Sequence, residues 1–135
     1  MSLLLFIDHV AITVADMEAT AAFYTRLFGA EVLMSHAQPN GQPMVRSLKI
    51  GGGVQLNLHQ LGNGVQLVAD KPTPGSVDIC FRWGGTIDEA IALLRKHGIE
   101  IVNGPSPRRA NDGRPAQSVY FLDPDRNLVE LMATD

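Results

Sequence analysis

The sequence lacks the features that mark secreted, disulfide-rich and membrane proteins. Cys80 is the single cysteine, so an internal disulfide is excluded. The longest apolar run, Leu3 to Ile7, is far shorter than the roughly 20 residues that cross a bilayer. Met1-Ser2 shows neither the basic region nor the cleavage site of a signal peptide. Together these absences predict a cytoplasmic protein.

The sequence also lacks a large excess of positive or negative charge. The formal net charge is only −3, which does not support a basic nucleic-acid-binding surface. The hydrophobic content of 45% is enough for a packed interior, and 135 residues make one compact domain or two half-size units that share a core. Cys80 lies in a predicted strand, Val77–Trp83, with no adjoining basic residue to favour a thiolate, so we expect a small buried thiol.

The first half of the chain predicts the order β-α-β-β-β. Asp16 has the character of a helix N-cap, and Gly29 follows the apolar stripe where a left-handed residue would end the helix. Between them we expect a helix over Met17–Phe28. The predicted strands are Phe6–Val14, Glu31–Ser35, Met44–Ile50 and Val54–His59.

The second half predicts the same order after a linker over Leu61–Pro74. Thr86 and Glu89 form a capping-box pattern, and the helix that they open should end at Gly98. The predicted strands are Val77–Trp83, Ile99–Val102, Gln117–Leu122 and Leu128–Met132, with a loop over Gly104–Arg114.

The two halves also match in spacing. The chain advances by the same 20 residues from His9 to Gly29 and from Asp78 to Gly98. In both halves the glycine is followed by an apolar residue, a glutamate and a β-branched residue. We therefore expect a duplicated unit. A half this small cannot bury its own sheet face well, so the two halves should pair and share a concave surface.

Near the C-terminus, two predicted strands are joined by a tight turn over Asp123–Asn127, whose short polar side chains bond their own backbone. The second strand carries Glu130. Strand alternation places Glu130 on the same face as Leu128 and Met132. A carboxylate between apolar neighbours needs a metal, a cation or a proton, because burying a lone charge is costly.

Three side chains therefore form a candidate constellation. His9 lies near the start of the first predicted strand, His59 ends the last strand of the first half, and Glu130 lies in the last strand of the second half. If the first and last strands of each half are adjacent, both histidines face one hollow, with Asp78 and Glu130 opposite. Two imidazoles and one or two carboxylates suit a divalent first-row metal.

Several motifs of the chain, taken together, resemble those of a known family. The likeness covers nearly the whole sequence and is to the vicinal oxygen chelate superfamily, which includes glyoxalase I, bleomycin-resistance proteins, fosfomycin-resistance enzymes and extradiol dioxygenases. It is nearest to the small glyoxalase-domain-containing proteins, among them bacterial virulence-protein homologues. The motifs that carry it are Phe6–Val14, Phe23-Tyr24 with Phe28-Gly29, Leu56–His59, Pro74–Cys80 and Asp123–Glu130.

The resemblance implies an α+β fold with two paired βαβββ modules that form a curved mixed sheet around a metal cleft, usually in a dimer. It implies one vicinal oxygen chelate domain over 1–135, with module one at 5–60, a linker at 61–75 and module two at 76–133. The length of the linker also leaves open whether a module folds back or reaches a second chain, and we expect a homodimer.

The family's metal ligands transfer residue by residue. His9 matches the first-strand histidine and Glu130 the final-strand glutamate. Asn57 stands where glyoxalase I has a glutamate, and His59, two residues on and on the same strand face, is the substitute that we expect. The predicted ligands are thus His9, His59 and Glu130. Asp78 replaces a common histidine and is either a fourth ligand or a base.

Residues for substrate binding are predicted beside these ligands. Arg109, in the Arg108-Arg109 pair, can meet an anionic group because a planar guanidinium pairs with carboxylate or phosphonate. Asn57 and Tyr120 complete the predicted set. Tyr120 shares a strand face with Ser118, but the sequence does not decide whether that face lines the hollow.

The expected function is a metal-dependent glyoxalase-type lyase or isomerase that acts on a small oxygen-chelating substrate. A divalent ion (Zn, Ni, Mn or Fe) would hold two substrate oxygens, and Glu130 or Asp78 would move the proton. The alternatives are a thiol transferase or a dioxygenase of the same superfamily, or a metal-free drug-binding protein of the bleomycin-resistance type.

Overall fold

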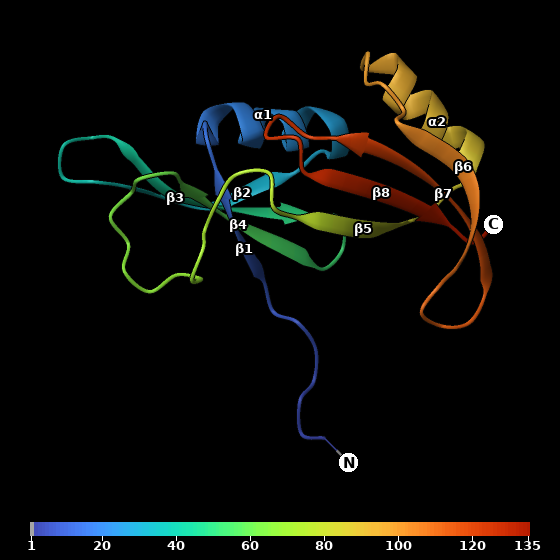
Figure 1. Ribbon diagram of the computed structural model, residues 1–135, viewed down its shortest axis with the longest axis horizontal. Coiled ribbons are helices and arrows are strands. Elements are labelled where there is room, and N and C mark those ends of the chain that lie inside the picture. The colour runs from blue at the N-terminus through green and yellow to red at the C-terminus, as the bar shows by residue number, and fades with distance from the viewer. Residues whose placement is uncertain (1) are drawn as a thin grey trace. The chain divides into compact units, whose positions relative to one another are not determined.

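Ten elements follow one another along the chain in two equivalent series (Figure 1). The computed structural model describes residues 2–135, so that of the predicted domain only Met1 lies outside the described residues. The first series is β1 Val10–Val14, α1 Met17–Phe28, β2 Glu31–Ala37, β3 Pro43–Ile50 and β4 Val54–Gln60. The second is β5 Asp78–Trp83, α2 Ile87–Lys96, β6 Asn103–Arg109, β7 Pro115–Leu122 and β8 Leu128–Ala133. The α+β fold with two βαβββ modules is confirmed.

The chain divides into two compact units, Met1–Pro74 and Gly75–Asp135. Each unit holds one mixed four-stranded sheet, in the order β1-β4-β3-β2 in unit one and β5-β8-β7-β6 in unit two. The first and last strands of each unit are neighbours and run parallel. The expected adjacency of these strands is thereby confirmed.

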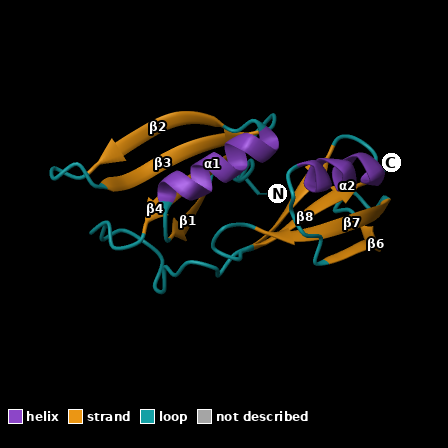
Figure 2. Cartoon of the chain, turned by 90° about the horizontal axis from the view of Figure 1, so that it is seen from above, coloured by secondary structure: helices purple, strands orange, loops and turns teal. Residues whose placement is uncertain are grey.

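One helix covers one face of each sheet (Figure 2). Helix α1 packs on β3 and β4, and α2 on β7 and β8. Burial of one apolar face of each sheet under its helix supplies most of the core. Unit one buries Ile12, Val14, Met17, Tyr24, Leu27, Leu48, Leu56 and Leu58, and unit two buries Leu94, Val119, Phe121, Val129 and Leu131.

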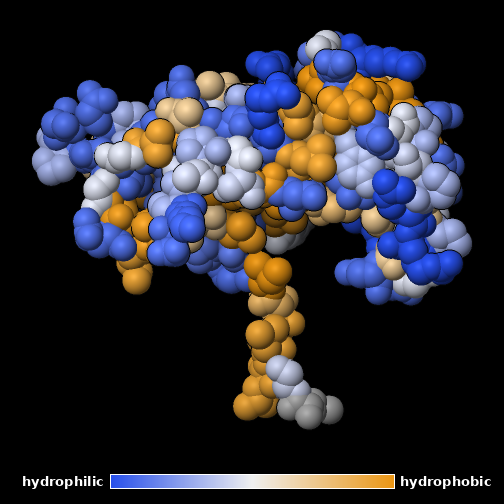
Figure 3. All heavy atoms as spheres, in the orientation of Figure 1, coloured by the Kyte–Doolittle hydropathy of each residue, from blue (hydrophilic) through white to orange (hydrophobic). Residues whose placement is uncertain are grey.

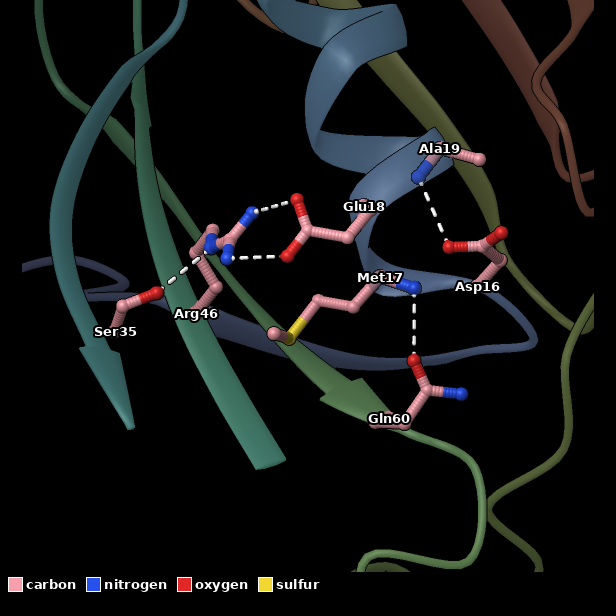
Figure 4. Close-up of polar contacts among 7 residues, drawn as sticks. All are labelled: Asp16, Met17, Glu18, Ala19, Ser35, Arg46 and Gln60. Carbon is pink, nitrogen blue, oxygen red and sulfur yellow. Dashed lines mark hydrogen bonds and ion pairs between the residues drawn. The ribbon is translucent and has the colours of Figure 1, made fainter. Parts of the chain in front are cut away.

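Helix α1 begins and ends at the predicted residues. The Asp16 carboxylate accepts a hydrogen bond from the Ala19 N–H at 3.1 Å, which satisfies one of the free donors of the first turn. Gly29 ends the helix at φ 66, in the left-handed region that glycine enters at little cost. Gln60 joins this helix to β4, because its side-chain oxygen accepts from the Met17 N–H at 2.8 Å (Figure 4).

An ion pair links α1 to β3 on the surface of unit one. The Arg46 guanidinium donates to both Glu18 carboxylate oxygens, at 3.0 and 2.7 Å, and to the Ser35 hydroxyl at 2.7 Å (Figure 4). The hydrogen bond from Arg46 lowers the pKa of Glu18 below its usual value. The Glu18 side chain remains 65% exposed, so solvent screens the pair.

Glu18→Gln should therefore destabilise unit one by less than about 1 kcal/mol. The stabilisation is present above the unfolded-state pKa of Glu18 and is lost as the pH falls through its lowered folded-state pKa, because the unfolded chain then binds the proton more readily. Urea unfolding at pH 7 and pH 3 tests this: the difference between wild type and variant should shrink at pH 3. A difference that grows at pH 3 would contradict the assignment.

Helix α2 has the predicted capping box. The Thr86 hydroxyl accepts from the Glu89 N–H, and the Glu89 carboxylate accepts from the Thr86 N–H, both at 3.1 Å. Gly98 follows the helix at φ 67.

The turn between β7 and β8 is built around one buried carboxylate. Asp123 accepts from the Asp125 N–H, the Asn127 N–H and the Asn127 side-chain amide, at 2.9, 3.0 and 2.9 Å. The Asn127 side-chain oxygen accepts from the Val77 N–H at 2.9 Å and so fixes the chain just before β5. Gly75 is required nearby, because a Cβ there would lie 2.7 Å from the Asp125 carbonyl oxygen.

The structure corrects three predictions from the sequence. Asn103–Arg109 forms strand β6, where the sequence predicted a loop, and the preceding Ile99–Val102 is not a strand. Pro105 and Pro107 are tolerated in β6 because it is the edge strand of its sheet, where a missing N–H costs no ladder bond. Cys80 is exposed rather than buried, since strand alternation turns it away from α2.

The third correction concerns the N-terminus. The first strand starts at Val10 instead of Phe6. Val10 pairs with Leu56, and β4 begins only two residues earlier, at Val54. The β-forming sequence before Asp8 therefore extends past the end of its partner strand.

Neither helix among residues 2–135 has the length and apolar character needed to cross a membrane.

Candidate functional site

In unit one, the sheet face that α1 leaves uncovered carries the predicted polar residues. Leu56 and Leu58 point toward α1 and are buried, so Asn57 and His59 point to the opposite face. His59 pairs with Thr13 and Asn57 with Ala11. His9 lies one residue before β1 and has the same parity as Ala11 and Thr13, which assigns it to the uncovered face.

The register separates the two predicted histidine ligands. His59 lies beside Thr13, four residues beyond His9 on the neighbouring strand. At about 3.3 Å per residue, the two positions are roughly 13 Å apart along the strands. Asn57, beside Ala11, lies only half as far from the level of His9. His9 and Asn57 are thus nearer neighbours than His9 and His59.

The Asn57 amide is held in one orientation. Its side-chain oxygen accepts from the Ser47 hydroxyl at 2.8 Å and from the Gln55 side-chain amide at 3.0 Å. Ser47 is buried, which fixes one side of this arrangement. With the oxygen engaged twice, the Asn57 NH2 group is the part of the side chain that can donate to a ligand.

The two histidines have different surroundings. His9 Nδ1 lies 2.8 Å from an Asp8 carboxylate oxygen, the contact that orients many ligating imidazoles and leaves Nε2 for a metal. His59 Nδ1 lies 3.5 Å from the Asn63 side-chain nitrogen. Burial lowers the pKa of His59, so its imidazole is neutral at pH 7. The His59 imidazole can therefore present a neutral ring nitrogen.

In unit two, the sheet face that α2 leaves uncovered carries four residues of interest. Three of them, Glu130, Asp78 and Tyr120, were predicted site residues, and the fourth is the exposed Cys80. Glu130 pairs with Cys80 on one side and with Tyr120 on the other. Asp78 lies on the same face, two residues before Cys80. Val129 and Leu131 are buried on the helix side, so Glu130 points away from the core while remaining half-buried.

The surroundings of Cys80 disfavour its thiolate form. Although Cys80 is exposed, its thiol is partly desolvated by its neighbours on the sheet face, and this, together with the neighbouring Glu130 carboxylate, raises the pKa of the thiol to about 11. The thiol is therefore protonated at neutral pH.

The two arginines of the predicted substrate-binding segment point in different directions. Arg108 pairs with Ala116, two residues from Ser118 and four from Tyr120, and so shares their face. Its Nε donates to the Tyr120 hydroxyl at 2.7 Å, and its guanidinium carbon lies 5.4 Å from the ring centre. Arg109 donates to the Gly113 carbonyl at 2.7 Å within the β6–β7 connection.

The sequence predicted a loop for both arginines, and of the pair only Arg109 was assigned to the substrate-binding set. If β6 had been predicted as a strand, the alternation of its side chains would have placed Arg108 on the face of Glu130. The pairing of β7 with β8 places Tyr120 and Ser118 on the face of Glu130.

Within residues 2–135 no three or more His, Cys, Asp or Glu side chains are placed so that together they could hold a metal ion. The candidate donors fall instead into one set in each unit. The chemistry of the donors fits a divalent first-row ion, since imidazole with carboxylate suits Zn, Mn, Ni or Fe. The contact from Asp8 to His9 Nδ1 is a structural feature that such a ligand needs.

Two βαβββ units, each with a polar uncovered sheet face, define the class of fold seen in glyoxalases. A sequence profile of the Glyoxalase/Bleomycin resistance protein/Dioxygenase superfamily matches residues 6–131. The chain belongs to this superfamily, as the resemblance of its motifs predicted.

Similar proteins support this assignment. The chain is 39% identical over 125 residues to glyoxalase domain-containing protein RDO1 of Mycosarcoma maydis; the match covers 93% of this chain and 66% of that protein. It is 34% identical to virulence protein STM3117 of Salmonella typhimurium, covering 93% and 81% of the two chains, and the crystal structure of that protein matches with a TM-score of 0.84. The chain thus spans about two thirds of the length of RDO1.

Another solved structure shares the fold alone. FosX, a fosfomycin resistance protein from Listeria monocytogenes solved with Mn(II) and sulfate, is 23% identical and matches with a TM-score of 0.65 over 98% of this chain and 95% of FosX. A protein with this fold was thus solved with a divalent metal.

Proposed function

We propose that this protein is a metal-dependent enzyme of the glyoxalase type, a lyase or isomerase acting on a small substrate with two adjacent oxygens. The observation that carries the proposal is that the first and last strands of the two units, β1 with β4 and β5 with β8, pair in the same register. In unit two, Asp78 pairs with Leu128, and Glu130 follows two residues later. In unit one, the β1–β4 pairing continued by one residue before Val10 sets His9 beside Gln55. Asn57 follows Gln55 by two residues, as Glu130 follows Leu128. Both units present polar groups at the same two strand positions.

His9 and Glu130 are the proposed metal ligands. They occupy complementary positions of the repeat, since His9 directly precedes the first strand of unit one and Glu130 lies on the last strand of unit two. The third ligand is His59 or Asp78. The separation of roughly 13 Å along the strands between His9 and His59 counts against His59 as a ligand beside His9. Asp78 lies on the face of Glu130, two residues from its level.

The bound ion would supply Lewis-acid stabilisation of negative charge on a substrate oxygen. The protein would provide the remaining interactions. The Asn57 NH2 group would donate to a substrate oxygen, and the carboxylate that does not bind metal, Asp78 or Glu130, would move the proton between adjacent carbons. Arg109 was the arginine predicted to bind substrate, but the pairing of β6 favours Arg108, held by Tyr120, for an anionic group.

Asp78→Asn separates its two possible roles. If Asp78 is the base, the variant should keep its metal and lose turnover by about 100-fold or more. If Asp78 is a ligand, the variant should lose metal, and His59→Ala should keep it. Metal content per chain and turnover of methylglyoxal–thiol adducts are the two measurements. Epoxide drugs with thiols, and catechols, test the transferase and dioxygenase alternatives.

The catalytic proposal fails if metal-loaded wild type turns over none of these substrates. Metal-free drug binding would then be the better description, and it would show as a ligand that raises the melting temperature without being consumed.

Tyr120→Phe tests the arginine–tyrosine contact. Loss of the hydroxyl removes the acceptor for Arg108 Nε, so the guanidinium should lose its fixed position. We expect KM for an anionic substrate to rise about 10-fold, which corresponds to one charge-assisted hydrogen bond, with kcat nearly unchanged. Steady-state kinetics of Arg108→Ala and Arg109→Ala complete the comparison. A larger effect of Arg109→Ala than of Arg108→Ala would restore Arg109 as the substrate-binding residue.

We also propose a homodimer, supported by the length of the Leu61–Pro74 linker, which allows a module to pair with a second chain. Light scattering at working concentration should give twice the chain mass of 14.6 kDa. A monomer would contradict the proposal.

A further inference from the structure

An extended apolar arm precedes the first strand. Leu3, Leu4, Leu5, Phe6 and Ile7 are 96%, 76%, 85%, 74% and 75% exposed, and we call Leu3–Ile7 the arm. It leaves β1 and extends away from sheet one (Figure 1), and it forms a continuous hydrophobic projection (Figure 3). Isolated apolar side chains on a surface are ordinary, but an uninterrupted exposed run marks an interaction site.

The backbone of the arm is also unpaired. Among residues 2–135 its one hydrogen-bond partner is the Ser2 hydroxyl, which accepts from the Leu4 N–H at 3.0 Å. The cause is the register: β4 begins at Val54, so the chain before Asp8 has no strand beside it. Phe and Ile favour strands, and the arm therefore has the composition and the free backbone groups of a strand without a neighbour.

A complementary edge exists on the far side of the same sheet. Strand β2 is the edge strand opposite β1, and every one of its residues is exposed. It carries Val32, Leu33 and Met34 in sequence, 46% to 49% exposed. An exposed apolar edge strand is a template for a further strand.

The arm as a whole cannot lie along the β2 edge of its own chain. A strand added outside β2 lies four strand spacings from β1, about 19 Å. Only Asp8 and His9 separate the arm from β1, and the three residue steps from Val10 to Ile7 span at most about 11 Å. A second copy of the chain is free of this restriction.

We propose that the arm of one copy adds as a strand to β2 of a second copy, and that the exchange is reciprocal. Each chain carries both the arm and the edge, so two copies satisfy each other and the assembly closes with twofold symmetry. Each arm buries on the order of 500 Å² of apolar surface. With the surfaces that receive them, two arms bury roughly 2,000 Å², in the range of stable protein interfaces. This contact gives the proposed dimer its surface and does not depend on the metal.

Charge on the arm tests the proposal. Leu3→Asp with Leu5→Asp places two charges on one side of the added strand and touches no other described element. We expect the dimer to dissociate, with its dissociation constant raised by at least 100-fold, while the metal content stays that of wild type. Leu67→Asp is the matched control, since Leu67 is 94% exposed outside the arm. A double variant that remains dimeric would overturn the proposal and leave the dimer itself standing; a monomeric wild type would overturn both.

A crosslink locates the partner of the arm. In a Cys80→Ser background, Leu5→Cys chains are mixed with Leu33→Cys chains and oxidised. We expect a disulfide-linked heterodimer as the main product. Leu5→Cys chains that link only to one another would show that two arms pair together, and the assignment to β2 would be wrong.

Discussion

Glu130→Gln is expected to weaken metal binding by at least 100-fold, and His9→Ala by a similar factor. Loss of a residue that only orients a ligand commonly costs 10- to 100-fold in metal affinity, roughly, so loss of a ligand itself should cost more. Glutamine keeps the size and the strand position of Glu130 and removes only the charge. Titration of the metal-free proteins with Zn²⁺ or Mn²⁺, followed by calorimetry, measures both affinities.

The controls for these variants are His97→Ala and His36→Ala. His97 caps the C-terminal end of α2, and His36 lies on the edge strand β2. Neither is a proposed ligand, and both variants should bind metal as wild type does. Equal losses in His9→Ala and His97→Ala would point to a general effect on folding, and unchanged affinity in Glu130→Gln would remove Glu130 from the ligand set.

Asp123→Ala should produce the largest loss of stability among the substitutions considered. The buried Asp123 carboxylate accepts three hydrogen bonds within the turn that leads into β8. Without it, the Asn127 N–H and side-chain amide are left buried and unsatisfied, at a cost of about 1–3 kcal/mol for each such group. We expect the free energy of unfolding to fall by about 3 kcal/mol in urea titrations.

Asp70→Ala is the matched control, because Asp70 is an exposed acid outside the helices and strands. It should change stability by less than about 0.5 kcal/mol. Similar stability of Asp123→Ala and Asp70→Ala would show that the turn forms without its central acceptor. Since β8 carries Glu130, we also expect Asp123→Ala to bind metal less tightly than Asp70→Ala.

Local sequence signals predicted the parts of the fold that are locally determined. Asp16, Gly29, Thr86 and Glu89 act through hydrogen bonds and backbone conformations within a few residues, and both helices formed where these residues indicated. Strand β6 was missed because its identity depends on its place at the sheet edge. Pro105 and Pro107 argue against a strand in general and are tolerated only there.

The sequence could predict which candidate residues share a strand face, but not which residues lie side by side on neighbouring strands. Alternation alone placed Asn57 and His59 on one face, and pairing of the outer strands was expected from the repeat. The register was not readable, and it is the register that puts His59 beside Thr13 and Glu130 beside Cys80 and Tyr120. Arg108 could be assigned to the face of Glu130 only after β6 was known.

The metal content of the wild-type protein tests the proposed function most directly. Protein purified without chelator should hold about one equivalent of a divalent first-row ion per chain by elemental analysis. Chelation should remove the ion and lower the melting temperature, and its return should restore both, because a ligand that binds only the folded state stabilises it. Protein with less than about a tenth of an equivalent, whose melting temperature no divalent ion raises, would contradict the metal-dependent function.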